Sequence, residues 1–355
     1  MPKPLVSVVI DTYNHERFIE EAILSALEQD LPHSDFEILV VDDGSTDRTP
    51  DIVRKFEPRL RLIRKPNGGQ ASAFNAGIPQ AQGEFIAFLD GDDWWARNKL
   101  TRVAEALAAE PSLGIVGHGI TMVHRDGREQ SEILREGFRF RADTAEGARL
   151  FRLRKSLLGT SRMTIRAGLL RRIGPVPEAL TVQADEYLFT LASVLAGGRI
   201  LPETLTFYRL HDANSYQIAV FDPAKIRAKL SALTALAQCL REQLERHGID
   251  RETTRVIIEI IQAERDQLRL HWEGGWPWET VRTEQKIYQV MHPAAPLPHR
   301  IFKMLSLLPA MALPPKLYYG IRQKLSKSAL YLRTRQRWLP LPDSPHVRKD
   351  WRVGP

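Results

Sequence analysis

Short apolar runs alternate with segments of helical spacing over the first quarter of the chain. Four runs of strand length, rich in Val, Ile, Leu and Phe, occur at 5–13, 36–44, 59–65 and 84–90. Residues 16–29 lie between the first two and repeat apolar side chains every three or four positions, which predicts an amphipathic helix. Strands that are apolar on both faces and are separated by helices predict a parallel sheet covered by helices on both sides.

The pattern is less regular beyond residue 96. It indicates a helix at 97–111, a strand that enters a turn at Asp126–Gly127, and a strand followed by a helix at 161–174. Residues 184–198 predict a helix that ends at a Gly pair, and residues 199–211 predict strands.

The segment after residue 215 is helical and charged. Two long amphipathic stretches, 223–248 and 251–275, predict helices, and a Pro-rich joint at 293–298 precedes a basic tail. We therefore divide the chain into a main domain at 1–215, a helical extension at 216–292 and a basic amphipathic tail at 293–355.

Composition and charge refine this picture. A chain of 355 residues with 43% hydrophobic content can bury a sizeable core. Its one cysteine, Cys239, excludes an internal disulfide framework, and the N-terminus enters a strand-like segment without a signal-peptide pattern, so we expect a cytoplasmic protein. From residue 300 onward, twelve Lys and Arg face two Asp, a balance of +10 that leaves −3 of the total +7 for residues 1–299.

The basic tail predicts contact with a membrane surface and not a span. The longest apolar stretch, 301–315, is shorter than the ~20 residues that a spanning helix needs and is interrupted by Lys303, Pro309 and Pro314. It could lie on the anionic inner face of a plasma membrane, where the cations would be attracted. The alternative is a solvated tail or one packed on the rest of the chain. No nucleic-acid-binding module or stacking pattern is recognisable, so no nucleic-acid partner is expected.

Polar clusters follow three of the predicted strands. They read "DTYNH" at 11–15, "VDDGSTD" at 41–47 and "LDGDD" at 89–93. In parallel sheets of this kind, ligands bind beyond the carboxyl ends of the strands, so we place the active site at this edge.

Asp90, Asp92 and Asp93 form the densest of these clusters. Neighbouring carboxylates disfavour each other's ionisation unless a cation lies between them. A site with a small number of hard oxygen ligands suits Mg²⁺ or Mn²⁺. Such a cation could neutralise a diphosphate and stabilise a departing phosphate. The alternative is a polar turn whose Asp side chains cap the next helix.

Two further motifs are candidates for nucleotide binding. Asp43 could accept hydrogen bonds from a nucleobase; alternatively it only starts the turn, and Ser45 caps the following helix. The segment "NGGQ" at 67–70 places two glycines before a helix, a candidate anion-binding nest that makes Asn67 and Gly69 candidate ligands of a nucleotide-sugar.

Five motifs together resemble glycosyltransferase family 2, in the order expected for its GT-A fold. They are "VVIDTYNHERFIEEAILSALEQ", "ILVVDDGSTDRT", "NGGQASAFNAGI", "GEFIAFLDGDDWW" and "ADEYLFTLA", and the resemblance covers roughly residues 5–215. It implies an α/β fold with a Rossmann-like, mostly parallel sheet flanked by helices, followed by a helical C-terminal extension. It also implies a nucleotide-binding half at 1–95 and an acceptor half at 96–215.

The activity that the resemblance implies is an inverting, Mg²⁺- or Mn²⁺-assisted hexosyl transfer from a nucleotide-diphospho-sugar to an acceptor hydroxyl. By position, Thr12 and Asp43 would contact the base, and Asp90 would contact the ribose or the sugar. Asp92 would bind the metal, with Asp93 behind it.

The same resemblance assigns a general base and a histidine in the second half. Asp185 matches the base, although the family usually has Glu-Asp where this chain has Ala184–Asp185, so the following Glu186 remains a rival. His211 lies where related enzymes place a histidine near the diphosphate or the metal, and a structural histidine is the alternative.

The chemistry agrees with this assignment on its own terms. Inversion by single displacement needs a carboxylate that takes the acceptor's proton, together with charge stabilisation on the leaving group. Asp185 could instead be a helix N-cap, and Trp94 and Trp95 could stack on a sugar or simply pack in the core.

The acceptor is expected to be a saccharide or a lipid-linked molecule in surface polysaccharide or glycolipid assembly. One rival is a sugar nucleotidyltransferase, which would want a Gly-rich phosphate loop after the first strand, where "DTYNHERF" has no glycine. The other rival is a non-catalytic, membrane-associated sugar-nucleotide binding protein.

Overall fold

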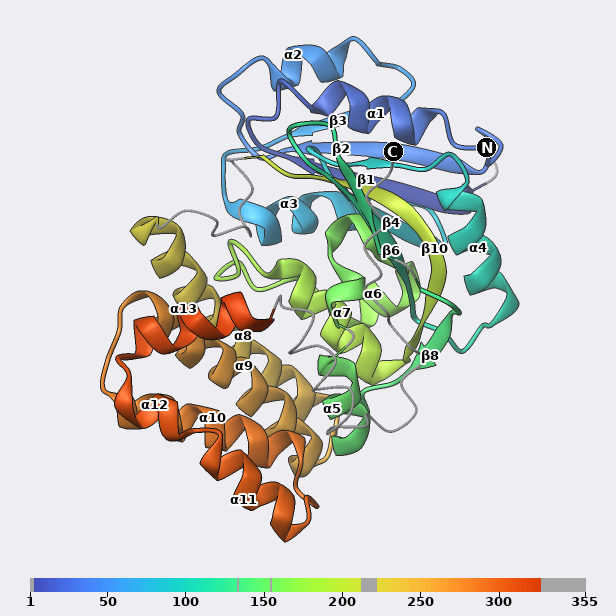
Figure 1. The fold of residues 1–355 in the computed structure, drawn as a ribbon. Helices are drawn as coiled ribbons and strands as arrows, with labels where there is room; N and C mark the ends of the chain where they lie inside the picture. The colour runs from blue at the N-terminus through green and yellow to red at the C-terminus, as the bar shows by residue number, and fades with distance from the viewer. Residues whose placement is uncertain (1–2, 133, 154, 212–221, 327–355) are drawn as a thin grey trace. The chain divides into compact units, whose positions relative to one another are not determined.

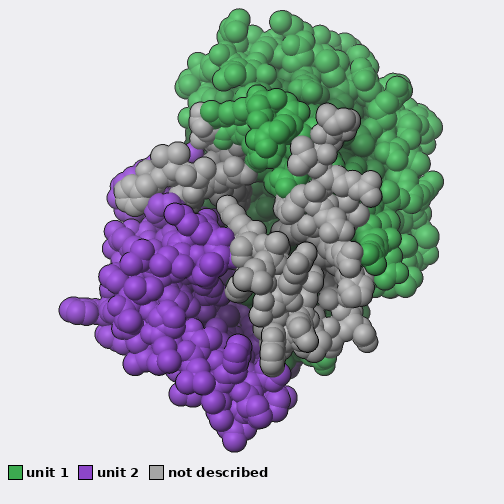
Figure 2. Space-filling view, viewed as in Figure 1, with its two compact units in different colours: residues 1–216, 345–355 green, residues 217–344 purple. Residues whose placement is uncertain are grey.

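The computed structural model describes residues 3–132, 134–153, 155–211 and 222–326. The chain divides into two compact units (Figure 2), residues 1–216 with 345–355 and residues 217–344. The last part of the predicted basic tail, 327–355, lies outside the described residues.

The first unit is built on a sheet whose first four strands are parallel. They are β1 (Val6–Thr12), β2 (Phe36–Asp42), β3 (Arg61–Arg64) and β4 (Phe85–Asp90), in the spatial order β3-β2-β1-β4. Asp11 of β1 pairs with Asp90 of β4, and Thr12 pairs with Asp42 of β2, so the polar ends of these strands share one edge. The predicted α/β fold is confirmed.

Helices cover both faces of this sheet (Figure 1). α1 (Ile19–Leu27) and α2 (Thr49–Arg54) lie on one side, and α3 (Gly69–Gly77), continued by the short η1 (Ile78–Gln80), lies on the other. α1 buries the apolar stripe that its spacing predicts. A Cβ on Gly77 would lie 2.9 Å from Val9 and 3.0 Å from Val41, so glycine lets α3 pack closely on the strands.

The second half extends the sheet with strands of mixed direction. Beyond β4 follow β9 (Thr164–Arg166), β6 (Ile115–Val123), β10 (Gly198–Arg209) and β5 (Trp94–Trp95), while β7 (Glu129–Ser131) pairs with β6 and β8 (Phe138–Phe140) with β10. β6 and β10 are parallel, but β9 runs antiparallel to both of its neighbours. An apolar pattern carries no information on strand direction, so this mixture was not expected.

The remaining helices of the first unit lie in this half. They are α4 (Lys99–Ala109), α5 (Ala145–Arg152), α6 (Ala167–Ile173), α7 (Ala184–Leu195) and the short η2 (Lys155–Leu158) and η3 (Thr160–Arg162). All twelve residues of α7 are buried, including its two acidic residues, which is unusual for charged side chains without a functional or pairing role.

The second unit is helical throughout its described residues. Its helices are α8 (Pro223–Arg246), α9 (Arg251–Trp272), α10 (Pro277–Met291), α11 (Leu297–Leu305), α12 (Leu308–Ala312) and α13 (Pro315–Ser326). Asp222 and Asp250 cap α8 and α9 by accepting hydrogen bonds from backbone N–H groups. Among the described helices none combines the length and apolar character needed to span a bilayer. The border between a helical extension and a basic tail stays a prediction.

Lys99 is a buried charge-bearing side chain outside the predicted site. It begins α4, is fully buried, and its Nζ has no hydrogen-bond partner in the described part of the chain, although it lies 3.2 Å from the centre of the Trp95 ring. Burial lowers the pKa of Lys99 well below its ordinary value. The positive end of the helix dipole also disfavours an ammonium there.

Replacing Lys99 with Met should therefore stabilise the protein by about 1–3 kcal/mol at neutral pH, since the contact with Trp95 offsets only part of the cost of burying the amine. The unfolded chain holds this proton up to the ordinary lysine pKa, whereas the folded chain loses it at lower pH. Wild-type stability should thus rise with pH between these two values, and the variant should lack that rise. Thermal unfolding at several pH values measures both effects, with the exposed Lys55→Met as control; an unchanged or lower melting temperature for Lys99→Met would contradict the prediction.

Candidate active site

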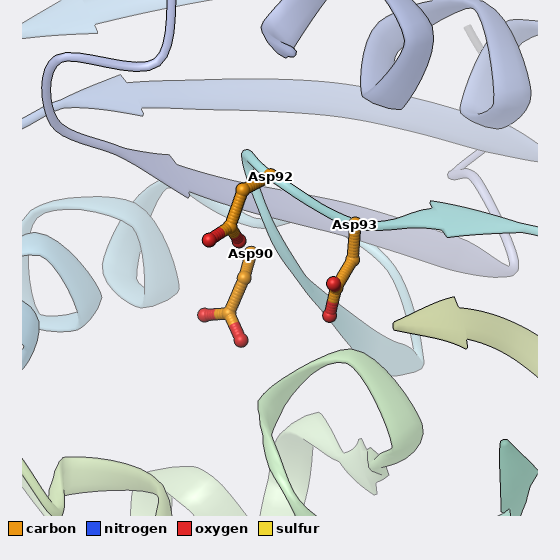
Figure 3. Close-up of side chains that lie close together, drawn as sticks. All are labelled: Asp90, Asp92 and Asp93. Carbon is orange, nitrogen blue, oxygen red and sulfur yellow. The ribbon is translucent and has the colours of Figure 1, made fainter. Parts of the chain in front are cut away.

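Three carboxylates meet where β4 ends. Asp90 is the last residue of β4, and Asp92 and Asp93 lie in the turn that leads to β5. One oxygen from each lies within 4.8 Å of the others, and the three side chains extend to the same side of the turn (Figure 3). Asp93 is buried and the other two are partly buried. The structure thus brings the three predicted residues into one cluster.

The second half of the unit holds Asp93 in place. The hydroxyl of Ser161 donates to Asp93 Oδ2 at 2.6 Å, and the backbone N–H of Arg209 donates to Asp93 Oδ1 at 3.1 Å. Ser161 Oγ also accepts from the backbone N–H of Asp90 at 3.1 Å, while its carbonyl accepts from Trp95 Nε1 at 2.9 Å and from Thr206 Oγ1 at 2.7 Å. Ser161 therefore joins the carboxylate turn to η3, β5 and β10.

Two histidines lie beside Asp92. His211 Nε2 hydrogen bonds to Asp92 Oδ2 at 2.9 Å, and His15 Nε2 lies 3.9 Å from the same oxygen. Burial alone would raise the pKa of Asp92, but the hydrogen bond from His211 and the positive charge that His15 can carry outweigh it and hold that pKa below its ordinary value. His211 packs on Phe18, with ring centres 4.6 Å apart.

The neighbouring carboxyls behave in the opposite way. Burial, then the charges of Asp11 and Asp92, raise the pKa of Asp90 well above its usual range. Burial and Asp92 do the same for the pKa of Asp93 in spite of the hydrogen bond from Ser161. The ionised forms of these carboxyls are therefore disfavoured unless a cation relieves their mutual repulsion.

Asp11 adds a fourth carboxyl to this environment. Its Oδ1 is buried without a hydrogen-bond partner among the described residues, and burial followed by the charge of Asp92 raises its pKa well above the ordinary value. Hard oxygen donors in a cluster, with one of them unsatisfied and buried nearby, are the surroundings that suit a divalent cation. The residues present fit such an ion, and Asp92, Asp93 and His211 could hold it.

Thr12 lies next to the carboxylate turn. Its Oγ1 is 3.2 Å from His15 Nδ1, and a Cβ on Gly91 would lie 2.7 Å from Thr12 Oγ1 and 2.9 Å from His15 Nδ1. Glycine at position 91 is what allows the turn to pass so close to the end of β1.

The glycine nest is engaged by a carboxylate of the chain itself. Asp43 accepts from the backbone N–H groups of Gly68 at 3.0 Å and Gly69 at 2.7 Å, and from Lys65 Nζ at 2.5 Å. These N–H groups therefore bind the carboxylate of Asp43 in the structure, whereas the sequence suggested a nest for an anionic ligand. Asn67 beside them is exposed. Roles of Asp43, Asn67 and Gly69 in nucleotide binding stay predictions.

Asp185 and Glu186 lie in the first turn of α7. The N-cap of this helix is Gln183, at φ 69°, so Asp185 is not the N-cap, and its Oδ1 accepts from the backbone N–H of Glu186 at 2.8 Å. Glu186 is tied to its neighbours by both oxygens, one to Lys155 Nζ and one to Gln183 Nε2. The charge of Asp185 contributes to the raised pKa values of Asp11 and Asp90, which relates it electrostatically to the carboxylate cluster.

The two tryptophans are used for packing. Trp95 is buried, and Trp94 stacks on Phe207 with ring centres 5.2 Å apart. The guanidinium of Arg209 lies 4.4 Å from the centre of the Trp94 ring, and its Nε donates to the carbonyl of Asp92 at 3.1 Å.

Sequence reasoning missed four residues of this site, namely Asp11, His15, Ser161 and Arg209. Asp11 had a signal, because it is the one charge inside the apolar run at 5–13, and His15 belongs to the polar cluster that follows this run. Ser161 and Arg209 had none, since their partners are 68 and 116 positions away in the chain.

Comparison with known proteins places the chain among transferases of sugars. A family model described as "Glycosyl transferase family 2" matches residues 7–170. The uncharacterized glycosyltransferase alr2836 of Nostoc sp. is 32% identical over 232 residues, which cover 64% of this chain and 71% of that protein. Poly(ribitol-phosphate) beta-N-acetylglucosaminyltransferase TarS of Staphylococcus aureus is 40% identical over 102 residues, only 28% of this chain and 18% of TarS.

Two solved structures share the fold. TarS 1–349 of S. aureus in complex with UDP-GlcNAc aligns with a TM-score of 0.51 at 21% identity, covering 81% of this chain and 90% of that one. The mannosyltransferase PcManGT of Pyrobaculum calidifontis, in complex with GDP-Man and Mn²⁺, aligns with a TM-score of 0.51 at 23% identity, covering 95% and 88%. At this level of identity the likeness concerns the arrangement of helices and strands.

Proposed function

The chain belongs to glycosyltransferase family 2 and has the GT-A fold, and from this we propose that it moves a sugar from a nucleoside diphosphate donor to an acceptor hydroxyl with inversion at the anomeric carbon. The observation that carries the proposal is the cluster of Asp90, Asp92 and Asp93 at the carboxyl ends of the strands, with Asp185 electrostatically coupled to it. The leaving diphosphate needs charge stabilisation, which a cation at the cluster would supply, and the attacking hydroxyl needs a base, which Asp185 would supply.

The donor would lie across the ends of β1, β2 and β4. Thr12 and Asp43 would contact the base, with Asn67 and Gly69 beside it, and Asp90 would contact the ribose or the sugar. Pairing of Thr12 with Asp42 and of Asp11 with Asp90 supports this, because it brings the three strand ends to one edge. The TarS and PcManGT structures hold UDP-GlcNAc and GDP-Man, which supports a nucleotide-sugar donor without selecting its base.

Mg²⁺ or Mn²⁺ would be held by Asp92, Asp93 and His211. When bound, the cation would neutralise the charge that develops on the departing diphosphate. His211 orients Asp92 through their hydrogen bond, and Ser161 and Arg209 orient Asp93. These contacts fix the direction in which the carboxylates point, which metal sites generally require of neighbouring residues.

Asp185 would act as the general base. It would take the proton of the acceptor hydroxyl while the oxygen attacks C1 opposite the leaving diphosphate. Glu186 is less suited, because its two oxygens are already engaged by Lys155 and Gln183.

The acceptor would be a saccharide or a lipid-linked molecule in surface polysaccharide or glycolipid assembly, at the cytoplasmic face of the plasma membrane. The name of TarS, which modifies poly(ribitol-phosphate), supports a polysaccharide setting. No feature of the described residues points to a nucleic-acid partner.

The test is thermal unfolding in the presence of UDP-, GDP-, CDP- and dTDP-sugars, each with and without Mn²⁺. A donor at about one hundred times its Kd should stabilise the folded state by ~2.7 kcal/mol, and only when Mn²⁺ is present. Release of nucleoside diphosphate must also be observed, since a binding protein without activity would be stabilised by the donor but would not release nucleoside diphosphate from it. Absence of stabilisation by every donor would overturn the proposal, and release of pyrophosphate from a nucleoside triphosphate and a sugar phosphate would replace it with nucleotidyl transfer.

A further inference from the structure

Helix α11 is amphipathic, yet its apolar face is exposed. Leu297, Ile301, Met304, Leu305 and Leu308 recur at helical spacing and form one stripe that ends just beyond the helix. All five are exposed, and α11 contains no buried residue. A helix with this pattern in a globular protein normally turns its stripe toward a core.

The exposed apolar surface continues along α12 and α13. We call it the α11–α13 surface and define it by ten side chains that are 40% to 69% exposed: Leu297, Ile301, Phe302, Met304, Leu305, Leu308, Met311, Leu317, Ile321 and Leu325. The described residues of the first unit contain three large exposed apolar side chains, Tyr13, Leu24 and Leu153. Such a concentration in thirty residues indicates an interaction surface.

These helices are nevertheless docked on their own unit by other residues. Leu307, Ala310 and Tyr319 are buried, and α12 and α13 contact α10 and α9. Glu284 of α10, itself 2% exposed, pairs with Arg322 of α13 and lies 3.6 Å from Lys303 of α11. The apolar side chains therefore point outward from a fixed scaffold.

Charge identifies the partner. Residues 297–326 contain five Lys or Arg and no Asp or Glu. Two of these cations are used by Glu284, while Arg300, Lys316 and Lys324 are exposed. A second copy of the chain on a two-fold axis would bring these positive charges face to face, which disfavours self-association through this surface. An anionic lipid surface would attract each of them by about 1 kcal/mol.

We propose that the α11–α13 surface docks on an anionic lipid bilayer, with its apolar side chains entering the headgroup boundary and Arg300, Lys316 and Lys324 binding lipid phosphates. Amphipathic helices of this composition lie in the plane of a bilayer interface. This proposal adds to the proposed function the surface by which the protein would reach the membrane. The observations behind it come from the second unit alone.

Co-sedimentation of the full chain with vesicles tests this docking. The wild type should bind vesicles that contain phosphatidylglycerol and bind pure phosphatidylcholine far more weakly. The variant I301S/L305S/L308S should bind vesicles at least tenfold more weakly, since it removes apolar side chains that would be buried in the bilayer. These three positions are exposed in the protein, so the substitutions should not disturb the fold. The variant R300Q/K316Q/K324Q should lose about fivefold per cation and most of its salt dependence.

The matched control is L24S/L153S, which removes exposed apolar side chains of the first unit and should bind as the wild type does. Wild-type binding by I301S/L305S/L308S would overturn the proposal. The proposal would also be overturned if the wild type were a dimer and I301S/L305S/L308S were a monomer that still binds vesicles. In that case a second copy of the chain would occupy the surface. Loss of vesicle binding with intact transfer to a soluble acceptor supports the docking surface, and intact vesicle binding without transfer by any donor would sink the proposed function alone.

Discussion

Replacing Asp185 with Asn is expected to lower kcat by about 10²–10⁴-fold while leaving donor binding intact. The amide keeps the size of the side chain and can still accept a hydrogen bond from the Glu186 N–H, but it cannot take a proton from the acceptor. Initial rates of nucleoside diphosphate release measure the first effect. The donor-dependent shift of the melting temperature measures the second.

Glu186→Gln is the matched control, because it changes the next residue in the same helical turn. It breaks the largely buried pair with Lys155 and should lower stability, with a far smaller effect on kcat. The opposite outcome, a silent Asp185→Asn and an inactive Glu186→Gln, would make Glu186 the base. Melting temperatures of both variants without ligand separate catalytic loss from unfolding.

Replacing Asp92 with Asn is expected to weaken Mn²⁺ binding at least tenfold and to lower kcat/KM by about 10²–10³-fold. Asp92 is the carboxyl of the cluster whose pKa is held low, so it supplies the negative charge that is present before any cation binds. Its neutral replacement would also leave His211 without its ionised partner. Electron paramagnetic resonance of free Mn²⁺ during titration gives the affinity without reference to activity.

The exposed Asp51→Asn serves as the control for this titration, since Asp51 lies in α2 and forms an ion pair with Arg54, another exposed residue of that helix. Mn²⁺ affinity of the wild type should also increase with pH, because Asp93 has a raised pKa and must lose its proton before it can bind a cation. Unchanged Mn²⁺ affinity in Asp92→Asn would remove this residue from the metal site.

Much of the site follows from local sequence. The apolar runs define β1, β2 and β4, and the residues directly after such runs must lie at one edge of a parallel sheet. The position of Thr12, Asp43 and the cluster at 90–93 at this edge could therefore be predicted from the sequence. The start of α7 was likewise visible, although its N-cap is Gln183 and not Asp185.

The rest depends on contacts that no local pattern records. The engagement of Asp43 by Gly68 and Gly69 joins two loops that were each interpreted separately as ligand sites. The antiparallel strand β9 follows η3 and so places Ser161 next to the carboxylate turn, and the sequence of its three residues, Thr-Ile-Arg, does not reveal its direction. The sequence alone predicts the edge of the sheet, whereas the hydrogen bonds from Ser161 and Arg209 that orient Asp93 are visible only in the tertiary structure.

The bracing by Ser161 has a consequence for engineering. A hybrid that joined residues 1–95 of this chain to the second half of a relative would keep β1, β2 and β4, which carry the proposed donor-binding residues. It would lose the hydroxyl that holds Asp93 unless the incoming sequence supplied one at the position of Ser161, whereas any residue except proline at position 209 would still provide the backbone N–H. The second half can therefore be exchanged only with a relative that preserves these contacts to Asp93, although a simple division into halves would suggest that any relative could be used.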